Sequence, residues 1–162
     1  MKAMFKSCPS QWKVAELLLR NGIRVSEGKA YCGDIEQSDS AISRAAGTDR
    51  RAVRTTLERI SSTPELDSFF TKLRPMLSMA DLAPEIGCSS IVIVPTDAKI
   101  PGILADITTV LYKAGVSVRQ AVVDDSGDRD KSVLLVVADG RIPPETIGNL
   151  KLCRGVSSII IR

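Results

Sequence analysis

The sequence changes in character after Gly87, and this change constrains the fold more than any other feature. The segments that follow alternate in type, and they read as strand, helix, strand, strand, helix, strand: SSIVIVPT, PGILADITTVLYKAG, VSVRQAVVDD, KSVLLVVAD, PPETIGNLKLCRG and SSIIIR. Short Val- and Ile-rich runs favour strands, whereas apolar residues three and four positions apart favour helices. The charged, glycine-containing bend over 124–131 is typical of a hairpin tip. We therefore expect a ferredoxin-like βαββαβ domain over residues 88–162.

Two of the expected strands, 91–94 and 133–137, are nearly unbroken aliphatic runs. A strand with one face in water alternates apolar and polar residues, so these runs indicate a sheet that needs cover on both faces. Two helices cover only one face of a four-stranded sheet, and the other face must meet another subunit or the chain's own amino-terminal part. We therefore expect a homo-oligomer, at least a dimer, formed through this half.

Residues 38–60 have the pattern of a helix-turn-helix, with Gly47 at the turn. The motif needs small or apolar residues where its two helices cross. The residues expected to face inward are Ile42, Ala45 and Ala46 on the first helix and Val53, Leu57 and Ile60 on the second. A helix over 10–21 and a small hairpin around Glu27-Gly28 supply the further elements against which such a pair packs. We expect this helical domain to span residues 1–62.

The outward face of the second helix is rich in hydrogen-bond donors, and it comprises Arg50, Arg51, Arg54 and Thr55. The planar guanidinium of arginine reaches a guanine edge or a phosphate with two bonds. The first 60 residues are net basic, although the whole chain carries only +3. These features favour contact with duplex DNA, and the six aromatic residues are too few for a base-stacking platform. The alternative is a solvated helix face on which Asp49 and Glu58 pair with the arginines.

Several classes of function are disfavoured by what the sequence lacks. The chain has no histidine, which removes the usual general base near neutral pH and most zinc sites. Its four cysteines are scattered without a CxxC pair, so we expect reduced packing thiols and no metal site. The acidic residues of the 124–131 bend read as a solvated turn, and we expect neither catalysis nor a cofactor. No apolar run is long enough for a signal peptide or a membrane span, so we expect a cytoplasmic protein.

The βαββαβ order by itself decides no function, because RNA-recognition modules and small-molecule sensors share it. RNA recognition needs aromatic residues on the first and third strands, and neither strand has one. Pro101-Gly102 stands where the first helix of this half begins, and free backbone N–H groups at such a position favour an anion such as an amino-acid carboxylate. An equally simple reading is that Pro101 is a good first helical residue.

Residues 87–162 resemble an ACT domain, the amino-acid-sensing module, on Pro101-Gly102-Ile103-Leu104 and the Ala105-Asp106-Ile107 that follows. The whole arrangement, with DRRAV at 49–53 after a helix and a turn, resembles archaeal predicted regulators of amino acid metabolism. The resemblance implies an amino acid held between paired domains, and the positions carried over are Gly102, Ile103 and Leu104 before and in the first helix and Val118, Arg119 and Gln120 on the second strand. The family often has Asp or Asn two residues before the Pro-Gly. This chain has Lys99 there, and Asp97 is the nearby acidic side chain.

Together these features predict an α+β protein with a helix-turn-helix domain over 1–62, a connecting helix and linker over 63–87, and an ACT-like domain over 88–162. The predicted function is an amino-acid-responsive transcription regulator that binds duplex DNA and a small effector. The alternative is a stand-alone ACT regulatory subunit that docks on an amino-acid biosynthetic enzyme and offers its arginine face to an acidic surface.

Overall fold

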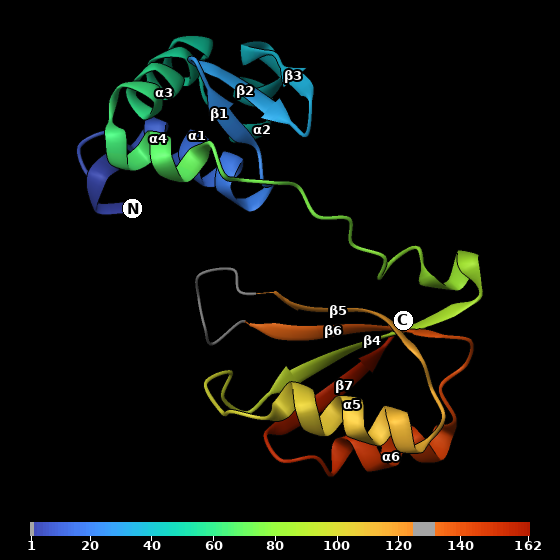
Figure 1. The fold of residues 1–162 in the computed structure, drawn as a ribbon. Helices are drawn as coiled ribbons and strands as arrows, with labels where there is room; N and C mark the ends of the chain where they lie inside the picture. The colour runs from blue at the N-terminus through green and yellow to red at the C-terminus, as the bar shows by residue number, and fades with distance from the viewer. Residues whose placement is uncertain (1, 125–131) are drawn as a thin grey trace. The chain divides into compact units, whose positions relative to one another are not determined.

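Residues 2–124 and 132–162 are described by the computed structural model shown in Figure 1. The chain divides into a first unit, Met1–Leu77, and a second unit, Ser78–Arg162. Of the hairpin tip predicted over 124–131, residues 125–131 lie outside the described residues. The described residues have an α+β fold, with helices and a small sheet in the first unit and a larger antiparallel sheet in the second.

The first unit combines helices with a three-stranded antiparallel sheet. Its elements are the 3-10 helix η1 (Lys2–Phe5), α1 (Pro9–Arg20), β1 (Arg24–Ser26), β2 (Lys29–Cys32), β3 (Ile35–Gln37), α2 (Asp39–Ala46), α3 (Arg50–Ser62) and α4 (Pro64–Phe70). Helix α1 matches the helix predicted over 10–21, but it begins at Pro9, whose missing N–H costs nothing at a helix start.

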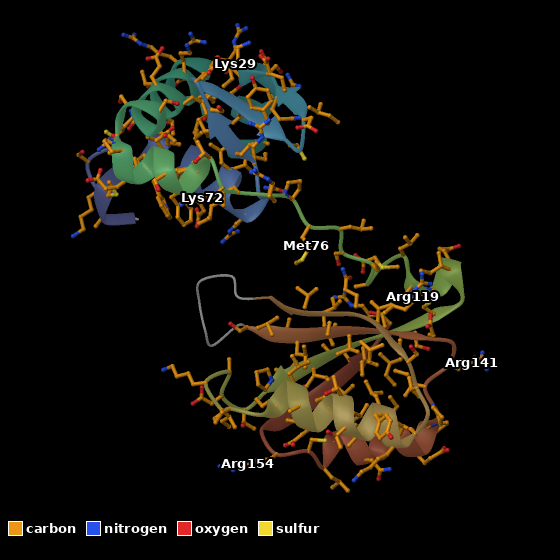
Figure 2. All side chains as sticks on the ribbon, viewed as in Figure 1. Lys29, Lys72, Met76, Arg119, Arg141 and Arg154 are labelled. Atoms are coloured by element: carbon orange, nitrogen blue, oxygen red, sulfur yellow. The ribbon has the colours of Figure 1, made fainter. Side chains whose placement is uncertain are left out.

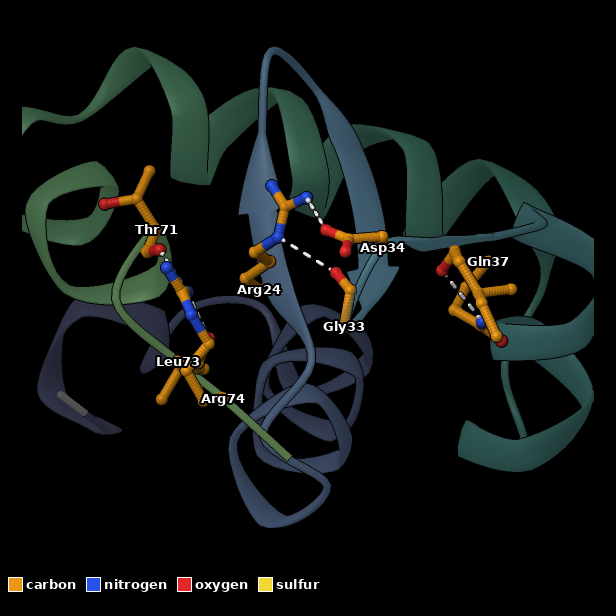
Figure 3. A network of polar contacts seen from close by, with 8 residues as sticks. Arg24, Gly33, Asp34, Gln37, Thr71, Leu73 and Arg74 are labelled. Carbon is orange, nitrogen blue, oxygen red and sulfur yellow. Dashed lines mark hydrogen bonds and ion pairs between the residues drawn. The ribbon is translucent and has the colours of Figure 1, made fainter. Parts of the chain in front are cut away.

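The hairpin predicted around Glu27-Gly28 is confirmed as β1 and β2. Glu27 and Gly28 both have positive φ, 52° and 73°, which suits a two-residue turn between antiparallel strands. A third strand, β3, pairs with β2 and was not predicted, because three residues are too few to show a period of two. Arg24 holds the bend between β2 and β3, since its Nε donates to the Gly33 carbonyl at 3.1 Å and its guanidinium lies near Asp34 (Figure 3).

Helices α2 and α3 form the predicted helix-turn-helix, and each is capped by a side chain. The Ser38 hydroxyl accepts from the Ala41 N–H, and the Asp49 carboxylate accepts from the Ala52 N–H at 2.7 Å. Such caps satisfy backbone N–H groups that have no partner inside the helix. Gly47 ends α2 in the left-handed conformation, with φ 60°, as the predicted turn requires.

The inward stripe of α3 is confirmed, because Val53, Leu57 and Ile60 are all buried in the first core. The stripe of α2 differs at one position. Ser43 is buried there, whereas Ala45, which we expected to face inward, is exposed. Residues three and four positions apart share one helix face, so Ile42 and Ser43 both lie beside Ala46, which packs against the core, and the Ser43 hydroxyl donates to the Ser40 carbonyl at 3.1 Å.

Helix α4 is part of the first core, although the sequence placed it in a connecting segment over 63–87. Leu66 and Phe70 of α4 are buried with the residues of α1 and α3. The chain that follows is also held to this unit, because a Cβ on Gly22 would collide with the backbone of Arg74. Arg74 in turn donates to the Thr71 and Leu73 carbonyls after α4 (Figure 3). The first unit therefore continues past residue 62.

The second unit confirms the predicted βαββαβ order. It contains the 3-10 helix η2 (Ala83–Ile86), β4 (Cys88–Pro95), α5 (Ile103–Lys113), β5 (Val118–Asp124), β6 (Val133–Asp139), α6 (Pro144–Lys151) and β7 (Val156–Ile161). The four strands form an antiparallel sheet in the order β5-β6-β4-β7, so the two aliphatic runs lie on the two central strands. Helices α5 and α6 lie together on one face of this sheet (Figure 1).

The other face of the sheet is partly covered by the chain itself. Residues 78–87, which we call the strap, run along the side of the sheet opposite α5 and α6 (Figure 1). Ala80 and Ala83 of the strap are buried. The Met79 N–H donates to the Gln120 side chain at 2.8 Å, and Asp81 accepts from Arg162 at 2.9 Å. The strap thus supplies part of the cover that the aliphatic strands need.

Candidate functional site

The four outward residues predicted on α3, Arg50, Arg51, Arg54 and Thr55, are all exposed. Arg50 is the first residue of α3, so the four residues lie in the first two turns of the helix. The buried stripe of α3 begins at Val53, and the side that carries these four residues faces solvent. Arg59, on the same helix, has a different role. It donates to Gln11 and to the Met4 carbonyl, and its guanidinium lies over the Phe5 ring. Arg59 therefore stabilises the fold, whereas the first three arginines face outward.

The interactions that hold the outward arginines are weak. Arg54 Nε donates to Glu58 at 3.0 Å, and both side chains are more than half exposed. Arg50 reaches the Ser40 hydroxyl only at 3.5 Å. An exposed i,i+4 ion pair contributes roughly 0.3–0.5 kcal/mol, so another anion displaces Glu58 at little cost. The predicted Asp49 pairing is replaced by its capping bond to Ala52.

A concave surface lies beside these arginines and extends to the small sheet. Its walls include Lys29 at the start of β2, Gln37 of β3, Ser40 of α2, and Arg50 and Arg54 of α3. Lys29, labelled in Figure 2, donates to Glu36 at 3.0 Å, and this hydrogen bond together with the carboxylate charge raises the pKa of Lys29. The concave surface thus holds three basic side chains, with the carboxylates of Glu36 and Asp39 also in its wall.

A second candidate site lies in the second unit, where the loop after β4 meets the start of α5. A cavity of about 190 Å³, which we call the sheet-end cavity, opens there. Its wall includes Ile93 of β4, Ala98 and Ile100 of the loop, Ile103 and Leu104 of α5, and Val123 of β5. Gly102 also contributes to the wall, so the structure brings together the predicted residues Gly102, Ile103 and Leu104 around one hollow.

The amino end of α5 at this cavity has no side-chain cap. Gly102 is the N-cap residue, and the first backbone N–H that bonds within the helix is that of Asp106, to the Gly102 carbonyl at 2.9 Å. The N–H groups of the first turn therefore have no intrahelical partner, and the helix dipole favours an anion near them. This arrangement fits the carboxylate that the sequence placed near Pro101-Gly102.

Asp97 and Lys99 are in the same loop, but neither contributes to the cavity wall that the described residues form. Both side chains are exposed. The Asp97 carboxylate accepts from the Lys99 N–H at 2.8 Å, and the Asp97 carbonyl accepts from the Ile100 N–H at 3.1 Å. In this structure Asp97 shapes the turn that places Ala98 and Ile100 in the wall.

Val118, Arg119 and Gln120 lie at the opposite end of the sheet from the cavity. Val118 pairs with Ala138 of β6, whereas the cavity residue Val123 pairs with Leu134. Arg119 (Figure 2) donates to the Cys88 sulfur at 3.6 Å and lies 3.5 Å from Asp139, and the bond to Cys88 raises its pKa. Gln120 accepts from the strap at Met79. One chain alone therefore does not bring the two predicted groups of ligand-binding residues together.

Sequence reasoning missed several residues that line these surfaces. Lys29 and Gln37 come from the small sheet, and Ala98, Ile100 and Val123 come from segments with no motif of their own. An alternation of apolar residues through the loop, Ala98 and Ile100 beside the exposed Asp97 and Lys99, was the available signal. Within 2–124 and 132–162, no group of three or more metal-ligating side chains occurs. No helix in the same ranges has the length and hydropathy to cross a membrane.

The second unit contains a match to a known family. Residues 99–151 match the model of the ACT domain family, and this stretch includes α5 and the end of the loop, from Ile100 on, that lines the sheet-end cavity. Two solved structures align with most of the chain. The crystal structure of PH0061 is 11% identical, with 94% of this chain and 88% of that chain covered and a TM-score of 0.28.

The second is a complex of the transcriptional regulator NMB0573 with L-Met from Neisseria meningitidis. It is 12% identical, covers 95% of this chain and 86% of that chain, and has a TM-score of 0.27. No curated protein matches the chain. The ACT match and the βαββαβ fold together identify the second unit as ACT-like.

Proposed function

We propose that the protein is an amino-acid-responsive transcription regulator that works as a dimer. In this proposal α3 of the first unit enters the major groove of duplex DNA, and the ACT-like second unit binds the amino acid. The observation that carries the proposal is the pairing, in one chain, of a helix-turn-helix whose second helix presents three exposed arginines with a unit that matches the ACT family.

The exposed side of α3 supports contact with DNA. Arginine side chains at the amino-terminal end of the second helix are placed where a helix-turn-helix reads base edges. Arg50 and Arg54 lie one helical turn apart, and their present partners, Ser40 and Glu58, are weak competitors for a phosphate or a guanine edge. Lys29 and Ser40 of the neighbouring concave surface add donors suited to the DNA backbone.

The sheet of the second unit supports dimer formation. The strap leaves part of the helix-free face uncovered, where Ile160 of β7 is 50% exposed and Val94 of β4 and Leu135 of β6 are only half-buried. A second copy that covers this surface removes it from water. A dimer also resolves the separation of the ligand residues, because the cavity of one copy and the 118–120 strand of another can then face the same ligand.

The switch works only if the amino acid binds two arrangements of the dimer with different affinity. A tenfold change in DNA affinity requires a coupling free energy of about 1.4 kcal/mol between the two sites. An amino acid held between two ACT-like units meets this requirement, since it contacts the arrangement in which the units are paired and loses contacts when they separate.

The decisive test is a gel shift with genomic duplex fragments at low and high salt, with and without each amino acid. We expect retention that weakens steeply with salt, because phosphate contacts release counterions, and that changes with at least one amino acid. Absence of retention at low salt in every condition contradicts the proposal. In that case a pull-down that captures an amino-acid biosynthetic enzyme supports the alternative role as a regulatory subunit.

Replacing Ile160 by lysine is expected to weaken the dimer by roughly tenfold or more, because a charge then lies in a surface that must lose its water on pairing. Sedimentation velocity over a range of concentrations measures the dissociation constant. Leu152→Lys is the matched control, since Leu152 is 85% exposed after α6, away from this face. A dimer that survives Ile160→Lys but dissociates in the control shows that another surface pairs.

A further inference from the structure

The sheet-end cavity carries information on which amino acid the protein senses. We infer that the effector is an amino acid with an aliphatic side chain, of the size of valine, leucine, isoleucine or methionine, and that the loop residues Ala98 and Ile100 with Val123 select it. This inference rests on the proposed function, because it assigns the specificity of the amino-acid site.

The chemistry of the described part of the wall favours an aliphatic effector side chain over a charged one. Among the described residues the wall is formed by aliphatic side chains from β4, the loop, α5, β5 and β6, and no charged side chain is part of it. Ser132 supplies the hydroxyl in this wall. A carboxylate or ammonium group moved from water into such surroundings without an opposite charge is strongly disfavoured, whereas an alkyl group is favoured by its own transfer from water.

The size of the cavity limits the occupant to a small molecule. At about 190 Å³ it is smaller than the roughly 300–1,000 Å³ of pockets that hold drug-sized ligands. It is also bounded on several sides, because it lies between the loop, the first turn of α5 and the ends of β5 and β6. A peptide or a nucleotide does not fit such a space, whereas a single aliphatic side chain does.

The position of the cavity gives the occupant a polar end as well. Gly102, the N-cap of α5, and Leu104, in its first turn, both line the cavity, and the backbone N–H groups of this turn lack intrahelical partners. An amino acid whose carboxylate lies near this turn places its side chain toward Ile93 and Val123. The apolar wall then contacts the part of the molecule that differs between amino acids, and this contact makes the wall a determinant of specificity.

Isothermal titration calorimetry of the full-length protein with individual amino acids tests the inference. We expect binding of at least one of valine, leucine, isoleucine and methionine, and binding of aspartate and lysine on the order of 100-fold weaker. Removal of one methylene from the preferred ligand is expected to weaken binding by roughly tenfold or more. Preferred binding of a charged amino acid overturns the inference and leaves amino-acid sensing intact. Failure of all twenty to bind overturns both.

Two substitutions locate the binding site. Ala98→Leu fills the cavity and is expected to weaken binding of the preferred ligand by roughly tenfold or more. Ala105→Leu is the matched control, because Ala105 is exposed on the same turn of α5 but outside the wall, and we expect unchanged affinity. Leu104→Ala enlarges the cavity at a side chain that is 42% exposed, and it is expected to shift preference toward larger side chains. Unchanged affinity and preference in both cavity variants place the ligand elsewhere.

Discussion

Replacement of both Arg50 and Arg54 by alanine is expected to abolish measurable binding to duplex DNA at physiological salt. Each arginine that reads a base contributes roughly 1–3 kcal/mol of binding free energy, and each that contacts a phosphate contributes about one unit to the slope of log affinity against log salt. Fluorescence anisotropy with a labelled fragment taken from the gel shift measures both quantities. A flatter salt dependence in the double variant identifies phosphate contacts, and a loss of sequence preference identifies base contacts.

The structure makes this substitution a clean test, because both side chains are exposed and contribute little to the fold. Among the described residues, the Arg54 side chain bonds only to Glu58, in an exposed pair, and the Arg50 side chain bonds only to the Ser40 hydroxyl, at long distance. Replacement of both Arg141 and Arg154 by alanine removes the same two charges from exposed positions of the second unit (Figure 2) and is expected to leave DNA binding unchanged. Equal losses in the two proteins indicate a general charge effect and contradict a specific role for α3.

Replacement of Phe70 by alanine is expected to destabilise the first unit by about 3–5 kcal/mol, the usual cost of removing a fully buried aromatic side chain. Phe70 is 0% exposed and belongs to the core that α1, α3 and α4 share. Trp12, the single tryptophan, packs against this core, so its fluorescence during urea unfolding reports on the first unit alone. The expected result is a lower unfolding midpoint for the tryptophan signal.

The neighbouring Phe69 provides the control. It is 41% exposed, and its ring meets that of Phe70 at 5.5 Å between centroids. Phe69→Ala is expected to cost about 1 kcal/mol or less, since partly exposed side chains away from the core contribute little. If Phe70→Ala leaves the tryptophan transition unchanged, then α4 is a connector, as the sequence placed it, and is not a part of the first core.

Much of the fold follows from local patterns that a sequence displays directly. The order of strands and helices after Gly87 was correct because Val- and Ile-rich runs and helical spacing alternate there without ambiguity. The inward stripe of α3 was correct for the same reason, since Val53, Leu57 and Ile60 keep helical spacing. On α2 the predicted inward stripe contained Ala45, whereas the structure buries Ser43. This helix has only eight residues, so its sequence shows the helical period only twice.

The candidate sites were less accessible from the sequence. The outward arginines could be read from the helix on which they lie, because exposure on an amphipathic helix follows from its period. The sheet-end cavity could be found only in part. Gly102, Ile103 and Leu104 were marked by a motif, whereas Ala98, Ile100 and Val123 contribute to the wall only because the fold brings the loop after β4 and the end of β5 to the same cavity.

The sequence by itself determined the secondary structure order, the helix-turn-helix and the need of an aliphatic sheet for cover on two faces, because each depends on residues that are neighbours along the chain. The tertiary structure alone decided that β3 joins the hairpin, that α4 belongs to the first core and that the strap covers part of the sheet. Each of these depends on contacts between residues that are far apart in the sequence, such as Met79 with Gln120. The secondary-structure propensities of single residues do not include the free energy of such contacts.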